Sequence, residues 1–198
     1  TIKEVTSTEA TSASGSFEEV SIAEDVINED GSTTWATTSA AATQGSNSAY
    51  MNFLTYSDIG QEDYLIVATL NTTAIDAFEF SFDYAYARYS ESYNDGMEVV
   101  YRDQCGDWQT IFSQSGSELA TGPDQTSLFV PSGDQWASLG FLIQADEGTD
   151  VLQIAIKAIN GYGNALYVDN YVVQSFTNTF NISNVEVSDA SCSDVADG

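Results

Sequence analysis

One segment, AFEFSFDYAYARY at residues 77–89, constrains the fold of this chain more than any other. Its rings recur at every second position: Phe78, Phe80, Phe82, Tyr84 and Tyr86. Because successive side chains of a β-strand point to opposite faces, this period of two places all of these rings on one face of a long strand. The segment therefore predicts a central strand whose aromatic face is buried.

The rest of the chain alternates short β-forming segments with clusters of Gly, Asn, Asp and Ser, which is typical of strands joined by turns. No stretch combines helix caps with an amphipathic helical stripe. The candidate strands are 49–56, 64–70, 77–89, 96–102, 108–115, 127–131, 137–145, 151–160 and 165–176. We therefore predict an all-β fold, an antiparallel β-sandwich.

A chain of 198 residues is long enough for one β domain, so we expect a single hydrophobic core. Residues 1–15 lack an apolar period and predict a linker or a frayed N-terminus, and 34–48 predict a long loop. The domain should span 16–177. Residues 178–198 predict a linker or the start of a following module, so we expect neighbouring domains in the same polypeptide.

The charge balance excludes several classes of partner. Thirty acidic residues against four basic ones give a formal net charge of -26, which repels nucleic acid and disfavours anionic membranes. We expect a soluble monomer, whose acidity reflects either a salty habitat or cation binding. The chain has no histidine, the commonest general base, and no apolar run long enough to insert into a membrane. Pairing of Cys105 with Cys192 stays open.

An acidic residue, Asp169, stands in the middle of the closing segment GYGNALYVDNYVV at residues 161–173. Strands disfavour aspartate, and a buried carboxylate needs a charge partner or a metal. If Asp169 faces inward, we expect a calcium ion to compensate its charge. The alternative is a solvated residue at a sheet edge.

Four motifs in order carry a resemblance to a known family: Phe17-Glu18 followed by Trp35, FSFDYAYARY at 80–89, DGMEVVYRDQCGDWQTIFSQSGSELAT at 95–121, and GYGNALYVDNYVV at 161–173. The chain resembles the MAM-like jelly-roll modules, including the choice-of-anchor type, of secreted Bacteroidetes multidomain proteins. It departs from them where Gln104 separates Asp103 from Cys105 and where Tyr171 replaces an aliphatic residue. The resemblance implies a jelly roll and an extracellular location, secreted or attached to the cell surface.

The resemblance also implies a structural calcium between the first strand and the last. Carried over residue by residue, Glu18 and Asp169 are its side-chain ligands. Calcium takes six to eight oxygen ligands, so further suppliers are needed. The candidates for this role are Glu19, Asp30, Asp25 and Asp83. Such an ion would stabilise the fold rather than take part in catalysis.

Sugar binding would require aromatic platforms, because the apolar face of a sugar ring stacks on aromatic side chains while its hydroxyls need polar partners. The candidate platforms are Tyr89, Tyr93, Trp108, Trp136, Tyr162 and Tyr171, with Arg88, Asn94 and Asn164 as polar partners. The alternative for each ring is a place in the core.

Three functions follow as hypotheses. The first is a noncatalytic carbohydrate-binding module attached to a larger extracellular enzyme or surface protein, with a neutral polysaccharide as ligand because acidic ones would be repelled. The second is an adhesive or structural spacer module of a cell-surface protein or secreted metalloprotease. The third is a carboxylate-dependent glycoside hydrolase. Acid pairs such as Glu79 and Asp83 arise by chance in so acidic a chain, so we assign no catalytic residue.

Overall fold

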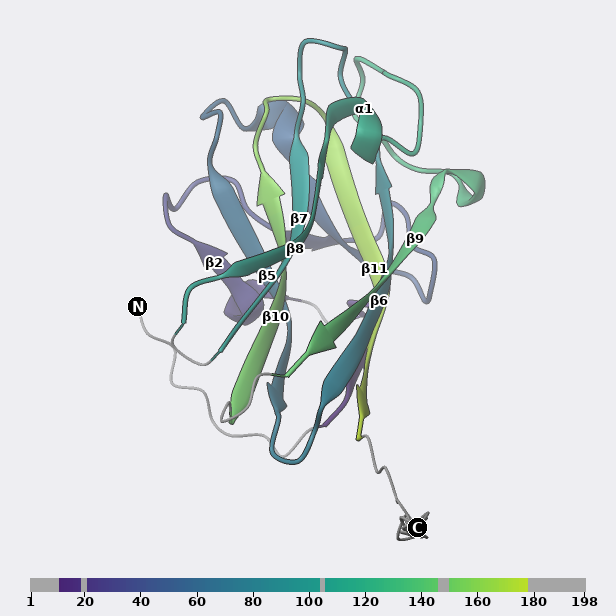
Figure 1. Cartoon of the computed structure of the whole chain (residues 1–198). Coiled ribbons are helices and arrows are strands. Elements are labelled where there is room, and N and C mark those ends of the chain that lie inside the picture. The colour runs from purple at the N-terminus through teal and green to yellow at the C-terminus, as the bar shows by residue number, and fades with distance from the viewer. Residues whose placement is uncertain (1–10, 19–20, 104–105, 146–149, 178–198) are drawn as a thin grey trace, which may run out of the picture.

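The computed structural model describes residues 11–18, 21–103, 106–145 and 150–177 and consists of two antiparallel sheets packed face to face (Figure 1). Sheet A has the order β3-β4-β11-β6-β9, with β1 paired to β11 as its sixth strand. Its strands are β1 (Ala13–Gly15), β3 (Ala36–Thr38), β4 (Ser48–Asn52), β6 (Ala77–Tyr86), β9 (Ala137–Gln144) and β11 (Ala165–Phe176). Together the two sheets confirm the predicted antiparallel β-sandwich.

Sheet B has the order β2-β5-β10-β7-β8. Its strands are β2 (Val26–Asn28), β5 (Glu62–Asn71), β7 (Gly96–Asp103), β8 (Gln109–Ser115) and β10 (Val151–Ile159). Helical structure in the described residues is limited to single turns: η1 (Ala23–Asp25), η2 (Phe53–Thr55), α1 (Gly116–Leu119) and η3 (Gly133–Gln135). Among the described residues, no helix is long and apolar enough to cross a membrane.

The alternation on β6 is confirmed, because its five aromatic side chains all lie in the core between the sheets, none more than 7% exposed. Leu152, Ile154 and Ile156 of β10 face them with no exposed surface. The other face of β6 is also partly covered. Ala85 and Ala87 belong to a second apolar cluster with Phe129, Ala165 and Tyr167 on the outside of sheet A.

The predicted boundaries need two corrections. Residues 13–15, expected in a linker, form β1 and pair with Tyr171–Val173 of β11. Residues 127–131, expected to be a strand, form a loop that places Phe129 over sheet A. The short strands β2 and β3 were not predicted, since three residues are too few to show a period.

Strand β11 changes partner halfway along one of its edges. Its first half, 165–168, pairs with β4, and 171–173 pair with β1. The register against β6 shifts between Asp169 and Val172, and Asn170 has a left-handed φ of 50°. Asp169 therefore lies at an irregularity between two strand pairings, where an acidic residue disturbs the ladder least.

Candidate functional site

A buried carboxylate organises one end of the sandwich. Asp95, the residue immediately before β7, has no exposed surface. Its Oδ1 accepts hydrogen bonds from the backbone N–H groups of Gly161 (2.8 Å) and Gly163 (3.0 Å). Its Oδ2 accepts from the N–H of Asn164 (2.9 Å) and the hydroxyl of Tyr86 (3.0 Å). Asp95 thereby fixes the β10–β11 turn on the β6–β7 loop.

Two positions of this turn must be glycine, because neighbouring atoms lie too close to leave room for a side chain. A Cβ at Gly163 would overlap the Asp95 carboxylate, and one at Gly161 would overlap the backbone of Asn94. Burial raises the pKa of Asp95, while the three backbone donors and Tyr86 oppose that rise. The cradle therefore holds a carboxylate in the interior by directing hydrogen-bond donors at it.

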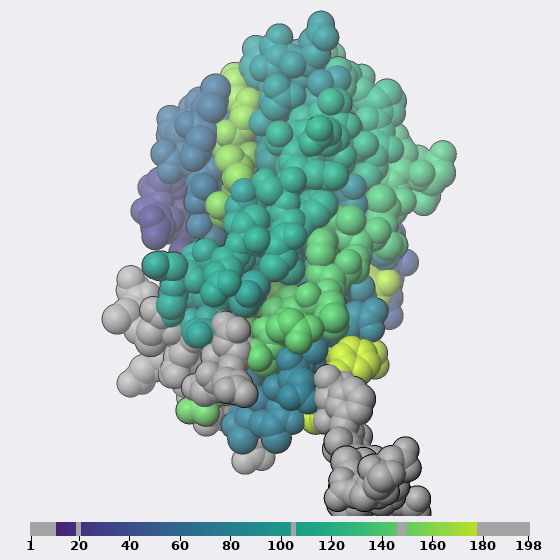
Figure 2. All heavy atoms as spheres, viewed as in Figure 1, coloured from purple at the N-terminus to yellow at the C-terminus, as the bar shows by residue number. Residues whose placement is uncertain are grey.

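Three tyrosines form a row above this cradle, which we call the tyrosine row: Tyr89, Tyr93 and Tyr162. The ring centroids of Tyr89 and Tyr93 are 5.4 Å apart and those of Tyr93 and Tyr162 are 6.0 Å apart, both in edge-to-face geometry. Tyr162 is 41% exposed and has a left-handed φ of 55°. The row lies where the β6–β7 loop and the β10–β11 turn meet, at the upper end of the molecule in Figures 1 and 2.

Two predicted polar partners of these rings are engaged by the protein itself. Arg88 makes a bidentate ion pair with Asp124, with Nε–Oδ1 at 2.9 Å and a second contact of 3.0 Å. Asn164 is completely buried: its amide donates to the carbonyls of Gln125 and Ser127, and its Oδ1 accepts from the N–H of Phe129. The assignment of Asn164 to ligand binding is therefore corrected, because its side chain holds the 125–129 loop and cannot reach a ligand in solution.

The predicted tryptophans lie elsewhere. Trp108 follows the β7–β8 turn, at the opposite end of β7 from the tyrosine row. Its ring stacks on Tyr64 with centroids 5.3 Å apart, and the Arg102 guanidinium lies 4.3 Å from the ring centroid. Trp136 is half-buried and packs edge-on against Tyr167 over the outside of sheet A. Both tryptophans therefore cover sheet surface and take no part in the row.

The two predicted calcium ligands converge on one loop. Asp169 has no exposed surface, and its Oδ2 accepts from the N–H of Thr43 (2.6 Å) and of Gln44 (2.9 Å). Oε1 of Glu18 accepts from the N–H groups of Ser46 (2.8 Å) and Asn47 (2.9 Å). Glu18 and Asp169 thus accept hydrogen bonds from neighbouring parts of the same loop between β3 and β4.

The donor chemistry of this loop suits a calcium ion in part. Two carboxylates are the side chains such an ion prefers, and a Cβ at Gly45, which has a φ of 71°, would overlap the Glu18 carboxylate. The loop directs backbone N–H groups at both carboxylates, however, and these donors already compensate their charge. Within the described residues, no group of three or more Asp, Glu or Cys side chains converges in a metal-binding arrangement.

The second-line ligands do not all lie in one place. Glu19 lies outside the described residues. Asp30 follows β2 of sheet B, where its carboxylate accepts from the Tyr56 hydroxyl (2.8 Å), so it does not join Glu18 and Asp169. Asp83 accepts from Asn170 Nδ2 at 3.0 Å and from Ser138. Asp83 stands directly opposite Asp169 in the β6–β11 pairing, so it lies beside Asp169, whereas Asp30 does not.

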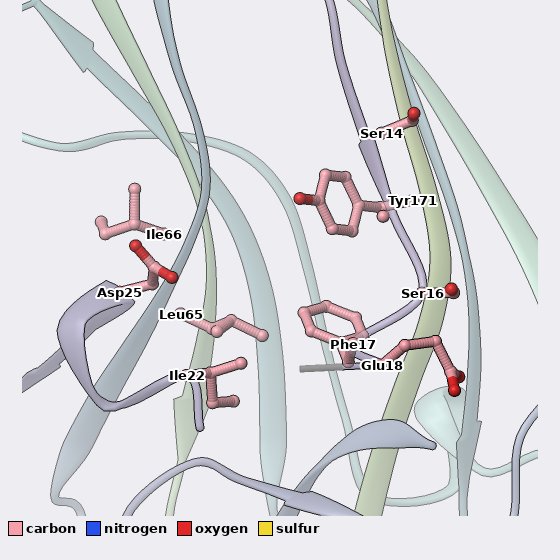
Figure 3. A pocket seen from close by; sticks show the side chains of 10 residues that line it. Ser14, Ser16, Phe17, Glu18, Ile22, Asp25, Leu65, Ile66 and Tyr171 are labelled. Atoms are coloured by element: carbon pink, nitrogen blue, oxygen red, sulfur yellow. The ribbon is translucent and has the colours of Figure 1, made fainter. Parts of the chain in front are cut away.

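A pocket of about 290 Å³ opens between β1, η1 and β5 (Figure 3). The rings of Phe17 and Tyr171, 5.4 Å apart, form one wall, and Ile22 and Leu65 form the other. The carboxylate of Glu18 points away from the pocket. The volume of the pocket lies at the lower limit of the range for ligand pockets, roughly 300 to 1,000 Å³. We locate the candidate binding surface at the tyrosine row, where three aromatic rings gather, and Tyr171 packs at the edge of the core.

Two buried acids were missed by sequence analysis, and each had a usable signal. Asp95 is in phase with the core residues Met97 and Val99, and Asp63 is in phase with Leu65 and Val67. A period of two therefore places both carboxylates on the inner face of sheet B. The reasoning that singled out Asp169 applies to them equally.

No model of a known protein family matches the chain, and no curated protein does. Solved structures do share its fold. The K1 cleaved adhesin domain of Lys-gingipain from Porphyromonas gingivalis is similar with a TM-score of 0.60 and 15% identity, over 84% of this chain and 99% of that one. The K3 adhesin domain of the same protein has a TM-score of 0.54 and 12% identity, over 82% and 98%.

The C-terminal family 22 carbohydrate binding module of Clostridium thermocellum Xyn10B is also similar, with a TM-score of 0.50 and 15% identity, over 84% of this chain and 94% of that one. At these identities the similarity establishes the fold alone. The fold is the jelly-roll sandwich that the resemblance implied. The finer assignment to MAM-like, choice-of-anchor modules remains a prediction.

Proposed function

We propose that this domain is a noncatalytic carbohydrate-binding module of an extracellular protein and that it binds a neutral polysaccharide at the tyrosine row. The observation that carries the proposal is the conformation of Tyr162. A large exposed ring is held on a left-handed backbone, which costs about 1 kcal/mol or more for a residue other than glycine. Such strain is most often retained where a side chain has to be presented for function.

The cradle beneath the row supplies the rigidity that binding needs. The N–H groups of Gly161 and Gly163 are fixed on Asp95, and the N–H of Tyr162 itself donates to Asn160 Oδ1 at 2.8 Å. Tyr93 then supports the Tyr162 ring from the neighbouring loop. A ring that is already ordered loses little conformational entropy when a ligand stacks on it, so its contact contributes more to affinity.

The charge of the chain selects among polysaccharides. With a formal net charge of -26, the domain repels sulfated and uronic acid polymers over roughly a Debye length of 8 to 10 Å. Neutral glycans such as β-glucans, mannans or xylans escape this repulsion. Affinity electrophoresis in a panel of neutral and acidic polysaccharides tests the proposal. Retardation by a neutral polymer supports it, and a blank panel would favour an adhesive or spacer module.

Replacing Tyr162 by alanine should abolish most of the binding. Loss of one stacking ring from a small platform is expected to weaken Kd about tenfold or more, since about 1.4 kcal/mol corresponds to a factor of ten. Isothermal titration calorimetry with the retarded polymer measures the change. Phe176→Ala is the matched control: Phe176 is 43% exposed, at the far end of β11, and its removal should leave Kd unchanged. Equal affinities of Tyr162→Ala and wild type would locate binding elsewhere.

We also propose that a structural calcium binds where Glu18 and Asp169 meet the β3–β4 loop. A cation there would draw the loop, the segment after β1 and the irregularity of β11 together, and binding to the native state alone raises Tm. Glu18→Gln should therefore reduce the rise in Tm that calcium produces over chelator. Glu79→Gln, which removes the same charge from an exposed position of β6, should not. A wild-type melt that is identical in calcium and in chelator would contradict this site.

A further inference from the structure

A second buried acid lacks the hydrogen bonds that Asp95 has. Asp63 of β5 is 1% exposed, and neither of its carboxylate oxygens has a hydrogen-bond partner among the described residues. The hydroxyl oxygen of Thr34 is likewise buried without a partner. Buried polar atoms are almost always paired in native proteins, so two unpaired groups in one place point to a missing ligand.

The segment between β2 and β3 folds over Asp63. Asn28 pairs with Asp63 across the two strands, and its Oδ1 accepts from the N–H of Gly31 at 2.8 Å. Asp30 Oδ1 accepts from the N–H of Ser32 at 2.9 Å. The indole N–H of Trp35 donates to the Asp63 carbonyl at 3.0 Å. The loop is thus tightly structured around the acid.

Two hydroxyls and a second carboxylate surround the Asp63 side chain. The hydroxyls of Thr34 and Tyr56 lie close enough to lower its pKa, although neither reaches hydrogen-bond geometry with it. Tyr56 instead donates to Asp30 Oδ2 at 2.8 Å. Asp30 is exposed, so it stands at the solvent side of the cluster.

No basic side chain in the described ranges compensates these two acids. The described basic residues are engaged elsewhere: Arg88 with Asp124, Arg102 with Gln153 and the Trp108 ring, and Lys157 with Glu62 and Glu98. Burial, together with the charge of Asp30, raises the pKa of Asp63 to about 6, although Thr34 and Tyr56 lower it. A positive charge from outside the chain would remove this penalty.

We propose that Asp63, Asp30, Thr34 and Tyr56 form a binding site for a divalent cation, and that calcium is its occupant. All four side chains offer oxygen, which is the ligand of calcium, and backbone carbonyls and water can complete six to eight contacts. Calcium accepts irregular geometry, whereas magnesium requires a near-ideal octahedron, so this uneven set favours calcium. The site lies on sheet B and is separate from the Glu18–Asp169 site, which lies on sheet A.

Terbium luminescence tests the site, because Tb³⁺ replaces calcium at oxygen sites and is excited by a nearby aromatic ring. Trp35 is hydrogen-bonded to Asp63 itself, so Tb³⁺ bound there should emit on tryptophan excitation and calcium should quench the emission by competition. Asp63→Asn and Asp30→Asn should each lose most of the signal. Glu29→Gln, the adjacent exposed acid, should retain it, as should Glu18→Gln, which affects only the other site.

Thermal melts of Asp63→Asn give a second readout whose sign depends on the cation. In chelator the variant should be more stable than wild type, because it removes an uncompensated buried charge. In calcium it should be less stable, because it has lost a ligand. A variant that is equally stabilised in both conditions would mean that Asp63 binds no cation, and that result, or Tb³⁺ emission unchanged by Asp63→Asn, would overturn the proposal.

Discussion

Asp95→Asn lowers the free energy of unfolding by about 3 kcal/mol, within the range for losing charged hydrogen bonds and leaving a buried donor unpaired. The carboxylate accepts four hydrogen bonds and donates none. An amide supplies one acceptor oxygen and turns an NH₂ group toward at least one backbone N–H. Urea unfolding monitored by tryptophan fluorescence measures the loss.

A charge control is necessary because this chain carries many acids, and removing any one of them reduces repulsion. Asp58→Asn serves this purpose, since Asp58 is exposed in the turn before β5. We expect it to change the free energy of unfolding by no more than about 0.5 kcal/mol. If Asp95→Asn were as stable as Asp58→Asn, the cradle would not be what holds the β10–β11 turn.

Gly163→Ala should destabilise the domain by about 2 to 3 kcal/mol, as overpacking of a buried site does. The φ of Gly163 is not in the left-handed region, so the cost comes from overlap of the new methyl group with the Asp95 carboxylate. The same substitution in an Asp95→Ala background should cost much less, because the overlapping group is gone. Urea unfolding of the four proteins measures this coupling.

Gly161→Ala provides the matched comparison for that cycle. A Cβ at Gly161 would meet the backbone of Asn94 and Asp95, which no side-chain truncation removes. Its cost should therefore persist in the Asp95→Ala background. If both glycine substitutions were relieved equally by Asp95→Ala, a general loosening of the turn, and not the specific overlap, would explain the result.

The long strands were predictable because their alternation of apolar and polar residues extends over enough positions to be recognised. The rings of β6 and the aliphatic residues of β10 lie where a period of two places them. The three-residue strands β1, β2 and β3 offer no such pattern and form because a longer neighbour pairs with them. Local sequence therefore predicts the centre of each sheet better than its edges.

The candidate site was predictable in part for a different reason. The three tyrosines were among the six candidate platforms, but their assembly depends on Asp95. Asp95 is followed by glycine, a pair that predicts only an ordinary turn. Asn164 was misassigned because a polar residue in a glycine turn usually faces water. Its burial depends on the 125–129 loop, whose position over sheet A is set by tertiary contacts that no short sequence window contains.

The change of pairing partner along β11 also sets where the chain enters and leaves the sandwich. Since β1 is antiparallel to β11, Ala13 lies beside Val173, and the chain enters the sandwich next to the point where it leaves at Phe176. The tyrosine row precedes the opposite end of β11, roughly 40 Å away for twelve residues at about 3.3 Å each. Within the described residues, the first and last strand residues of the domain therefore lie at one end of the sandwich, and the tyrosine row lies at the other end.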